Sequence, residues 1–307
     1  MSKLNKVMII ANPVSGKKAV SGYISDVCRI FLDNGWAPTV FITSKRGDAK
    51  EFAMEHGAEY DRVVAMGGDG TMNEVVNGLM EGNVDVSFAF VPSGTTNDFA
   101  STHNIPSDPL EAARLAATGR VRPIDVCRFN DRYFMFHGAC GFFADVVNTT
   151  NQDFKNVFGY LAYILDGIAN ATQLAPKHAK FILDGEEFED DFIYAALLST
   201  LSLGGSISSL PEDMVMSDDG MFEVMFARAP KDLFDVTEVL KEFNEKNFDG
   251  KYIKLKKVKN GIIETDDELS WSLDGEPYTG CKRIEVEVLK RKLKLVSSDG
   301  DVTLSEE

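Results

Sequence analysis

The sequence predicts a chain in two parts, a parallel α/β domain over residues 1–125 and an antiparallel β-sandwich domain over residues 126–294. In the first part, short β-branched runs alternate with amphipathic segments of helical period, which is typical of a parallel sheet with helices on both faces. In the second part, strand-like runs follow each other directly, and turn dipeptides such as Asp184-Gly185 join them as hairpins. At 307 residues the chain can bury one large core or two modest ones.

Start and stop signals mark several expected elements of the first part. The first helix ends at Asn34-Gly35, and Asp108-Pro109 supplies the cap and the N1 proline of the last one. Thr71 and Glu74 fit the capping-box pattern, which predicts that a helix begins there. The expected strands are 7–10, 40–42, 63–66 and 88–91, and the expected helices lie near 18–34, from 47, from 71 and over 108–119.

The second part is expected to consist mostly of strands, with hairpins at Asn130-Asp131 and Asp184-Gly185. A helix near 159–171 carries an apolar stripe, which we interpret as core packing rather than as a membrane anchor. The other expected elements are strands at 126–129, 133–136, 181–183, from 188, 194–198, 222–226, 252–258, 269–273 and 284–289, and a helix at 231–244.

The charge balance excludes one class of partner. With 32 Lys and Arg against 48 Asp and Glu, the net charge is −16, the opposite of the basic footprint that nucleic acid requires. The four cysteines are scattered without zinc spacing, which is typical of a reducing cytosol. No signal peptide and no apolar run of about 20 residues occurs, so we expect a cytoplasmic protein without a transmembrane segment. Two lysine-rich stretches, 251–259 and 290–294, are interpreted as solvated strand faces, with contact to an anionic membrane left open.

The run Gly67-Gly68-Asp69-Gly70-Thr71 is the most informative stretch of the chain. It follows an apolar strand and precedes a helical pattern, so it forms a strand-to-helix turn in which the main chain can approach an anion closely. A carboxylate inside such a turn repels a phosphate group unless a cation or a proton transfer is involved. The run lacks the Gly-Lys-Ser/Thr of a P-loop and the dinucleotide fingerprint. The sequence therefore predicts a different phosphate site with metal-linked chemistry.

Two further turns of this kind follow predicted strands. One begins at Asn12-Pro13-Val14-Ser15-Gly16 and the other is Pro92-Ser93-Gly94-Thr95-Thr96-Asn97-Asp98-Phe99. The carboxyl ends of parallel strands meet at one edge of a sheet, which is where open α/β sheets bind nucleotides. We therefore expect the three turns to lie together.

These three motifs, in this order and spacing, resemble the diacylglycerol kinase catalytic domain family, and more narrowly its soluble bacterial lipid kinases. Sphingosine and ceramide kinases share the motifs, and NAD kinases are more distant relatives. The resemblance continues through Ile124-Asp125, Phe142-Phe143-Ala144, Asp218-Asp219-Gly220 and Asp274-Gly275-Glu276, so it spans nearly the whole chain. It implies that the last residues, 295–307, return to the first domain, which binds ATP, and that the second domain receives the lipid.

The resemblance also implies roles for individual residues. Glu276 matches the general base that takes the proton of the lipid hydroxyl, and Asp69, Asp98 and Asp125 match an aspartate–water–magnesium network. Met216 and Met221, through their carbonyls, and Asp219, through its carboxylate, match a structural Mg²⁺ loop. The expected nucleotide contacts are Asn12, Pro13, Val14, Ser15, Gly16, Thr43, Gly68, Asp69, Gly70, Thr71, Met72, Asn73, Glu74 and Thr95.

Some residues depart from the family pattern. His137 stands where asparagine is expected, and Ala100-Ser101 stands where an arginine commonly follows the alanine.

From the resemblance as a whole we expect an ATP- and Mg²⁺-dependent lipid kinase with diacylglycerol as the favoured acceptor, acting at the inner membrane surface. Phosphatidylglycerol or a sphingoid base as acceptor, a catalytically silent lipid or nucleotide sensor, and NAD kinase activity are the alternatives. A homodimer is left open.

Overall fold

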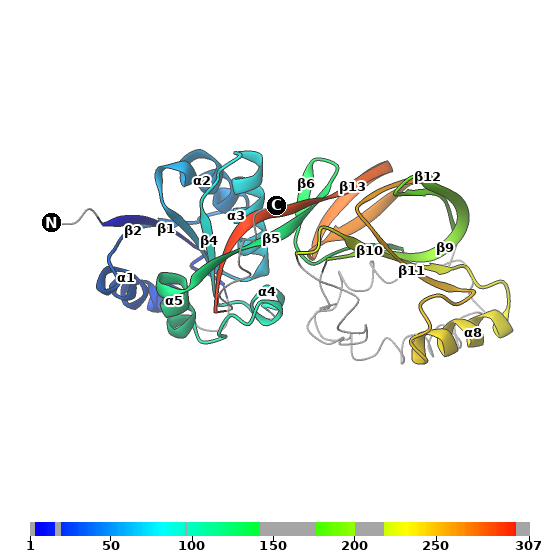
Figure 1. The fold of residues 1–307 in the computed structure, drawn as a ribbon, viewed down its shortest axis with the longest axis horizontal. Helices are drawn as coiled ribbons and strands as arrows, with labels where there is room; N and C mark the ends of the chain where they lie inside the picture. The colour runs from blue at the N-terminus through cyan, green and yellow to red at the C-terminus, as the bar shows by residue number, and fades with distance from the viewer. Residues whose placement is uncertain (1–3, 16–19, 96, 142–175, 200–217, 299–307) are drawn as a thin grey trace, which may run out of the picture. The chain divides into compact units, whose positions relative to one another are not determined.

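The computed structural model describes residues 4–15, 20–95, 97–141, 176–199 and 218–298. It divides the chain into two compact units, each described here by itself. Unit 1 comprises Met1–Val126 and Lys290–Glu307, and unit 2 comprises Cys127–Leu289. Unit 1 carries most of the described helices, and unit 2 is built mainly of strands (Figure 1). A helical N-terminal part followed by a strand-rich part is therefore confirmed.

The sheet of unit 1 has its strands in the order β2-β1-β3-β4-β13. All of these neighbours are parallel, and the last pairing joins Lys294 and Leu295 of β13 to Ser87 and Phe88 of β4. The C-terminal end of β13 thus lies in unit 1, where Leu295 and Val296 are buried. The strands are β1 (Asn5–Ala11), β2 (Trp36–Ile42), β3 (Arg62–Gly67), β4 (Ser87–Pro92), β5 (Arg120–Phe129), which also pairs with β13, and β13 (Glu276–Ser297).

Helices cover both faces of this sheet. Figure 1 shows α2 and α3 on one face and α1 and α5 on the other. A Cβ atom on Gly78 of α3 would lie 2.3 Å from the carbonyl oxygen of Lys50, so glycine allows α2 and α3 to pack closely. The helices are α1 (Ile24–Asp33), α2 (Asp48–His56), α3 (Asp69–Glu81), α4 (Asp98–Thr102) and α5 (Pro109–Thr118), with 3₁₀ turns at Val20–Gly22 and Gly57–Glu59.

One predicted helix start is confirmed and one is wrong. Asp108 caps α5 by accepting from the amides of Leu110 and Glu111, each at 3.0 Å. The capping box of Thr71 and Glu74 does not form, because α3 already begins at Asp69. The carboxylate of Glu74 instead accepts from the amide of Gly47 at 3.0 Å, at the start of α2.

Unit 2 is a curled sheet of antiparallel neighbours in the order β11-β10-β9-β7-β12-β13, with β8 also pairing with β9 and β12. Its elements are β6 (Arg132–Phe134), which pairs with the end of β5, β7 (His137–Gly141), β8 (Lys177–Leu183), β9 (Glu186–Leu198), β10 (Phe222–Arg228), α8 (Leu233–Asn244), β11 (Ile253–Val258), β12 (Asn260–Leu273) and the first part of β13. The helix expected at 159–171 lies outside the described residues, and the one expected at 231–244 is α8.

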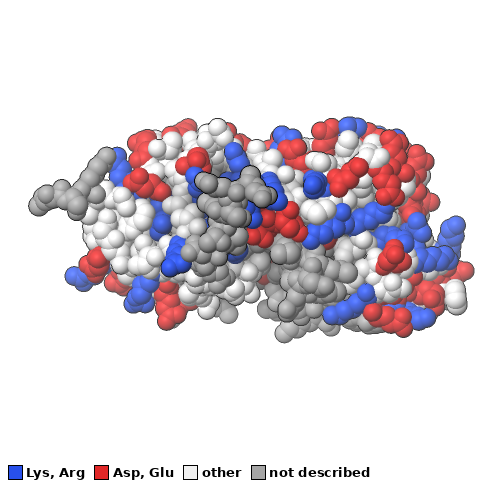
Figure 2. Space-filling view, viewed as in Figure 1, with Lys and Arg blue, Asp and Glu red and all other residues white. Residues whose placement is uncertain are grey.

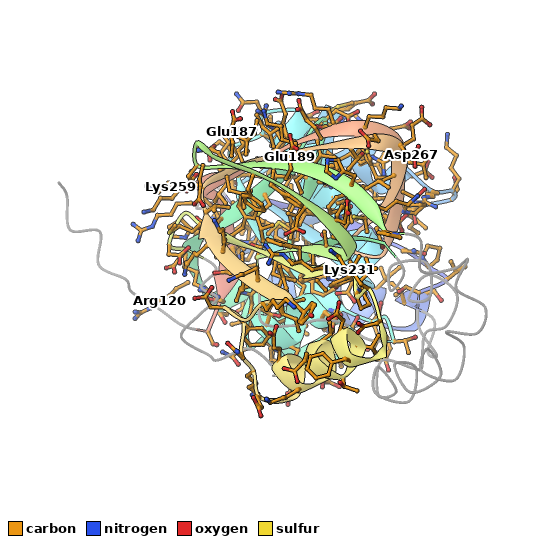
Figure 3. All side chains as sticks on the ribbon, turned by 90° about the vertical axis from the view of Figure 1, so that its right-hand side faces the viewer. Arg120, Glu187, Glu189, Lys231, Lys259 and Asp267 are labelled. Atoms are coloured by element: carbon orange, nitrogen blue, oxygen red, sulfur yellow. The ribbon has the colours of Figure 1, made fainter. Side chains whose placement is uncertain are left out.

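Aromatic side chains pack against each other in the core of unit 2. The ring of Phe181 stacks on those of Phe188 and Phe226, with centroids 5.0 and 5.1 Å apart. Glu187 and Glu189, labelled in Figure 3, flank Phe188 on β9 and are exposed. This alternation is the period-2 pattern of a strand with one wet face.

Two Asp-Gly turns close hairpins in unit 2. Asp184 and Gly185 have φ values of 48° and 89° and join β8 to β9, as the sequence predicts. Asp274 and Gly275 have φ values of 49° and 84° and join β12 to β13. Positive φ at both central residues is the backbone of a type I′ turn, which Asp-Gly favours.

Candidate active site

Three turns meet at the carboxyl edge of the sheet in unit 1. They follow β1, β3 and β4, which are successive parallel neighbours. The amide of Asn12 donates to the carbonyl of Met66 at 2.9 Å, and the amide of Ser93 donates to the carbonyl of Gly67 at 2.7 Å. The sheet therefore brings together the three motifs at the edge where open α/β sheets bind nucleotides.

Glycine is required in these turns for close approach. A Cβ atom on Gly94 would lie 2.7 Å from the Cα atom of Gly68, and one on Gly67 would lie 2.4 Å from Oγ1 of Thr71. None of these three glycines has a positive φ. The absence of side chains leaves main chain where the second and third turns touch, and main-chain amides can approach a phosphate group closely.

The first turn is fixed by the side chain of Asn12. Its Nδ2 donates to Oγ1 of Thr71 at 3.2 Å, and its Oδ1 accepts from the amide of Val14 at 3.2 Å. The Val14 residue is 84% exposed, whereas Pro13 and Ser15 beside it are half-buried. Asn12 thus ties the first turn to the second and leaves the tip of the first turn open to a ligand.

Thr43 lies next to this first turn. It follows β2, and its amide donates to the carbonyl of Ala11 at 3.0 Å, immediately before Asn12. Its side chain is largely buried. Gly16, which was also expected in this region, lies outside the described residues.

Asp69 links the second turn to the third. Its Oδ2 accepts from the amide of Asp98 at 3.2 Å and its Oδ1 accepts from that of Phe99 at 3.3 Å, so it caps the free amides at the start of α4. Burial raises the pKa of the Asp69 carboxyl, and these backbone hydrogen bonds oppose the rise. Asp69 therefore has a structural role, and its chemical role stays a prediction.

The third turn is closed by Asn97, which has a φ of 53°. Its Oδ1 accepts from the amide of Gly94 and its Nδ2 donates to the carbonyl of Gly94, both at 2.9 Å. Thr95 lies between these residues and is exposed. The turn therefore presents Thr95 to solvent on a loop held by one asparagine.

Other residues of the expected nucleotide set have side chains that serve helix packing. Met72 is fully buried in α3. The bond from Gly47 to Glu74 ties α2 to α3. Oδ1 of Asn73 accepts from Nδ2 of Asn77 at 3.1 Å, along the same helix.

Asp125 is buried in β5 and accepts from the amide of Arg291 at 2.7 Å. Arg291 belongs to the part of β13 that lies in unit 1. This bond fixes β5 against the returning strand. Asp98, the other expected member of the aspartate network, begins α4 and is half-buried.

Glu276 is the first residue of β13 and follows the Asp274-Gly275 turn of unit 2. The Asp274 carboxylate accepts from the amides of Met135, Phe136 and His137 at 2.7, 2.9 and 3.1 Å. The amide of Asp274 in turn donates to the carbonyl of His137 at 2.9 Å. Asp274 thus holds the hairpin that carries Glu276, a role that the Asp-Gly turn signal alone did not reveal.

His137 has a neutral imidazole at pH 7. Burial lowers the pKa of His137 to about 4, and its Nδ1 has no hydrogen-bond partner among the residues that the structure describes. The sequence analysis noted His137 as a departure from the family pattern. The structure places it next to Asp274 through the two backbone hydrogen bonds between them.

The Asp219 carboxylate lies in the turn before β10. Its Oδ1 accepts from the amide of Met221 at 2.9 Å, and its Oδ2 is 2.5 Å from Nζ of Lys257. Nζ of Lys257 is also 3.5 Å from Oε1 of Glu223, whose pKa burial raises to about 7. The sequence analysis included Lys257 only as part of the lysine-rich stretch 251–259 and did not single out Glu223. Met216 lies outside the described residues, and no group of three or more His, Cys, Asp or Glu side chains suited to a metal occurs in the part of the chain that the structure describes.

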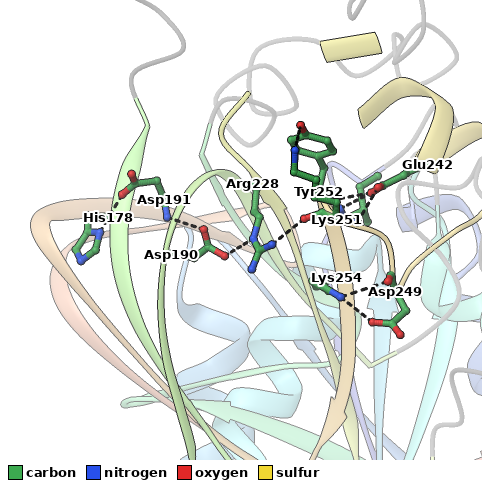
Figure 4. A network of polar contacts seen from close by, with 10 residues as sticks. His178, Asp190, Asp191, Arg228, Glu242, Asp249, Lys251, Tyr252 and Lys254 are labelled. Atoms are coloured by element: carbon green, nitrogen blue, oxygen red, sulfur yellow. Dashed lines mark hydrogen bonds and ion pairs between the residues drawn. The ribbon is translucent and has the colours of Figure 1, made fainter. Parts of the chain in front are cut away.

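Other lysines of the segment 251–259 also have acidic or polar partners. Nζ of Lys254 is 2.8 Å from Oδ1 of Asp249, and Nζ of Lys256 is 2.8 Å from Oε1 of Glu186. Nζ of Lys251 donates to the hydroxyl of Tyr252 at 2.7 Å (Figure 4). Figure 2 accordingly shows basic and acidic side chains next to each other over this part of the visible face. No helix among the described ranges is long and apolar enough to span a membrane.

Comparison with known proteins agrees with this geometry. Residues 6–129 match the model of the family described as "Diacylglycerol kinase catalytic domain". The diacylglycerol kinase of Bacillus subtilis (strain 168) is 30% identical over 295 residues, which cover 95% of this chain and 96% of that protein. The chain therefore belongs to the diacylglycerol kinase catalytic domain family, a family of lipid kinases.

The chain has further similarities to another lipid kinase sequence and to a solved structure. A protein of Alcanivorax borkumensis named "Probable lipid kinase YegS-like" is 28% identical over 93% of this chain and 95% of its own length. The crystal structure of a diacylglycerol kinase from Bacillus anthracis str. Sterne has a TM-score of 0.74 at 23% identity, covering 97% of this chain and 98% of that one. This last likeness shows that the fold is shared.

Proposed function

We propose that the protein is an ATP-dependent lipid kinase that phosphorylates the hydroxyl of a lipid alcohol, with diacylglycerol as the favoured acceptor and phosphatidic acid as the product. The observation that carries this proposal is the meeting of three turns at one sheet edge, with Gly68 and Gly94 in close approach and Asp69 linking the second turn to the third. Membership of a kinase family supports the transfer of a phosphoryl group, and the name of the Bacillus subtilis relative supports diacylglycerol as the acceptor.

In the proposed reaction, the acceptor oxygen forms a bond to the γ-phosphorus while the bond to the bridging oxygen of ADP breaks. The main chain at Gly68 and Gly94 would contact the phosphates, with Asn12, Thr43 and Thr95 at their sides. Glu276 would accept the proton of the hydroxyl, held in position by the hairpin that Asp274 fixes. The remaining proposed nucleotide contacts are Pro13, Val14, Ser15, Gly16, Gly70, Thr71, Met72, Asn73 and Glu74.

Mg²⁺ is part of the proposal as the ion that accompanies ATP and neutralises charge on its phosphates. Asp69, Asp98 and Asp125 are the carboxylates that would orient its water shell, and Asp69 also caps α4. The donor set at the Asp219 turn fits a second, structural Mg²⁺ poorly, because the ammonium of Lys257 already contacts the carboxylate.

The roles of the two units are likewise proposed. Residues 1–125 with the returning C-terminal residues would form the parallel α/β domain that binds ATP, supported by the parallel pairings of β1 to β4. Residues 126–294 would form a β-sandwich that receives the lipid at the inner membrane surface. The stacked rings of Phe181 on β8 and Phe226 on β10 would belong to the core of such a sandwich.

A single assay tests the function. The purified protein is incubated with Mg²⁺, γ-labelled ATP and one lipid at a time: diacylglycerol, phosphatidylglycerol or a sphingoid base. Labelled phosphatidic acid from diacylglycerol is the expected result. Label in another lipid would mean that this lipid, and not diacylglycerol, is the acceptor. The name of the Alcanivorax borkumensis relative specifies no acceptor and so keeps this alternative open. ATP binding without label in any lipid would favour a sensor, and label in NAD added in place of lipid would contradict the proposal.

A further inference from the structure

Three charged side chains meet at the turn before β10. Gly220 has a φ of 79°, and the turn that it forms places Oδ1 of Asp219 2.9 Å from the amide of Met221. Nζ of Lys257 lies 2.5 Å from the other carboxylate oxygen of Asp219 and 3.5 Å from Oε1 of Glu223. The ammonium is therefore in contact with one carboxylate and close to a second.

The strand register fixes this arrangement. Glu223 of β10 and Lys257 of β11 are directly opposite each other in an antiparallel pair, where side chains lie on the same face. The side chain of Glu223 is only 2% exposed and that of Lys257 is 33% exposed. A carboxylate buried to this extent is costly unless a cation lies near it, and Lys257 supplies that cation from within the fold.

A divalent cation bound by this turn would compete with the ammonium. Mg²⁺ and Ca²⁺ lie about 2.0 to 2.6 Å from their carboxylate oxygens. Lys257 occupies that approach to Asp219 at 2.5 Å, and two cations a few ångströms apart repel each other. The turn would hold either the ammonium or a metal ion at this carboxylate.

We propose that the ammonium of Lys257 takes the place of a structural metal ion at the Asp219 turn, so that this part of unit 2 is stabilised without Mg²⁺. The magnesium requirement of the proposed reaction would then arise at the nucleotide. The inference does not depend on the proposed function, since it concerns folding in the absence of ATP and lipid.

The test compares melting temperatures of the wild type, Lys257→Met and Lys256→Met in excess EDTA and in excess Mg²⁺. Lys256→Met is the matched control, since Lys256 lies beside Lys257 on β11, is 31% exposed and is paired with the exposed acid Glu186 of β9. The wild type should melt at the same temperature in both buffers. Lys257→Met should melt roughly 5 °C lower in EDTA, because it leaves buried carboxylates without their cation, and Mg²⁺ should restore part of the loss.

Two results would overturn the inference. One is that Mg²⁺ raises the melting temperature of the wild type but not that of Asp219→Asn, which would assign a metal ion to the turn. The other is a Lys257→Met protein that melts like Lys256→Met. Should Lys257→Met fail to fold, Lys257→Arg retains the charge, and its melting near the wild-type temperature in EDTA is the expected outcome. A Lys257→Arg protein that melts near the wild-type temperature only in Mg²⁺ would contradict the inference.

Discussion

The carboxylate of Asp69 combines a structural contact with a proposed chemical one. It caps the amides of Asp98 and Phe99 and thereby fixes the third turn against the second. Its burial in a phosphate-type turn also places a negative charge where a nucleotide-bound cation would need one. A substitution at Asp69 must therefore be judged by both folding and turnover.

Asp69→Asn should abolish most phosphoryl transfer while the protein stays folded. The asparagine retains the size and one acceptor oxygen of the aspartate, but not its charge, and loss of such electrostatic stabilisation costs on the order of 10²–10³ in rate. Lipid phosphorylation is measured together with a melting curve. Near wild-type turnover would contradict the chemical role, and loss of the folded state would assign Asp69 to structure alone.

Glu276→Gln should lower kcat far more than it weakens ATP binding. A general base typically contributes about 10²–10⁴-fold to the rate, and glutamine cannot accept the proton. Steady-state kinetics and ATP titration separate the two effects. A variant that loses ATP affinity while kcat barely changes would make Glu276 a binding residue.

At the scale of single elements, the hairpin between β12 and β13 is the one that matters for the proposed base. Asp274 accepts from the amides of Met135, Phe136 and His137, where the chain enters β7, and so anchors the turn that precedes Glu276. Unit 2 contains a second hairpin of the same type, at Asp184-Gly185, whose aspartate accepts from the amides of Lys259 and Asn260. The two hairpins can therefore be compared directly.

Asp274→Ala should destabilise the protein by about 1–3 kcal/mol, because backbone amides lose their acceptor. It should also lower kcat, since the hairpin that carries Glu276 loosens. Asp184→Ala removes a similar set of bonds from the other hairpin and should cost similar stability with kcat unchanged. Equal losses of kcat in the two variants would show that Asp274 acts through general stability only.

Local signals predicted these elements better than they predicted the site. Asp108 caps α5 and Asp184-Gly185 forms a type I′ turn because both depend on residues adjacent in sequence. The capping box at Thr71 failed because α3 begins two residues earlier, at Asp69, and Glu74 accepts from the amide of Gly47 at the start of α2. The contacts of Lys257 could not be predicted either, since the register of β10 and β11 brings together residues far apart in the chain.

At the scale of the whole molecule, most of the net charge of −16 lies in unit 2, where 16 Lys and Arg stand against 29 Asp and Glu. The lysines of segment 251–259 that the sequence left open for membrane contact are engaged in part by Asp249, Glu186 and Asp219. Paired lysines on a face rich in acids offer less attraction to anionic lipid than free ones. This segment is therefore a weaker candidate for a membrane contact than its composition alone suggested.

Each unit also contains a buried neutral histidine, which makes the whole molecule sensitive to acid. Burial, with the charge of Arg122 as a second cause, lowers the pKa of His103 to about 3, and burial lowers that of His137 to about 4. Both values lie below the ordinary one, near 6.5. The unfolded chain therefore binds protons first, and the stabilisation is complete above about pH 6.5 and is lost as the pH falls toward 4 and below.

The free energy of unfolding, measured with urea, should fall between pH 7.5 and pH 4.5 by on the order of a few kcal/mol in total. His103→Gln can still accept from Arg122 and should flatten the pH dependence in this range. His56→Gln, at a half-exposed histidine on α2, is the matched control for the loss of one histidine. If His103→Gln does not alter the pH dependence of the free energy of unfolding, His103 does not cause the loss of stability in acid.

The path of β13 has a consequence for how the chain folds during synthesis. Phe88 of β4 pairs with Leu295 of β13, so the sheet of unit 1 keeps an open edge at β4 until the ribosome has made all of unit 2. Domains usually fold in the order in which they leave the ribosome, and an unpaired strand edge exposed meanwhile favours aggregation. Here unit 2 can complete its core while unit 1 still awaits its last strand, so the first unit to emerge is the last to be finished.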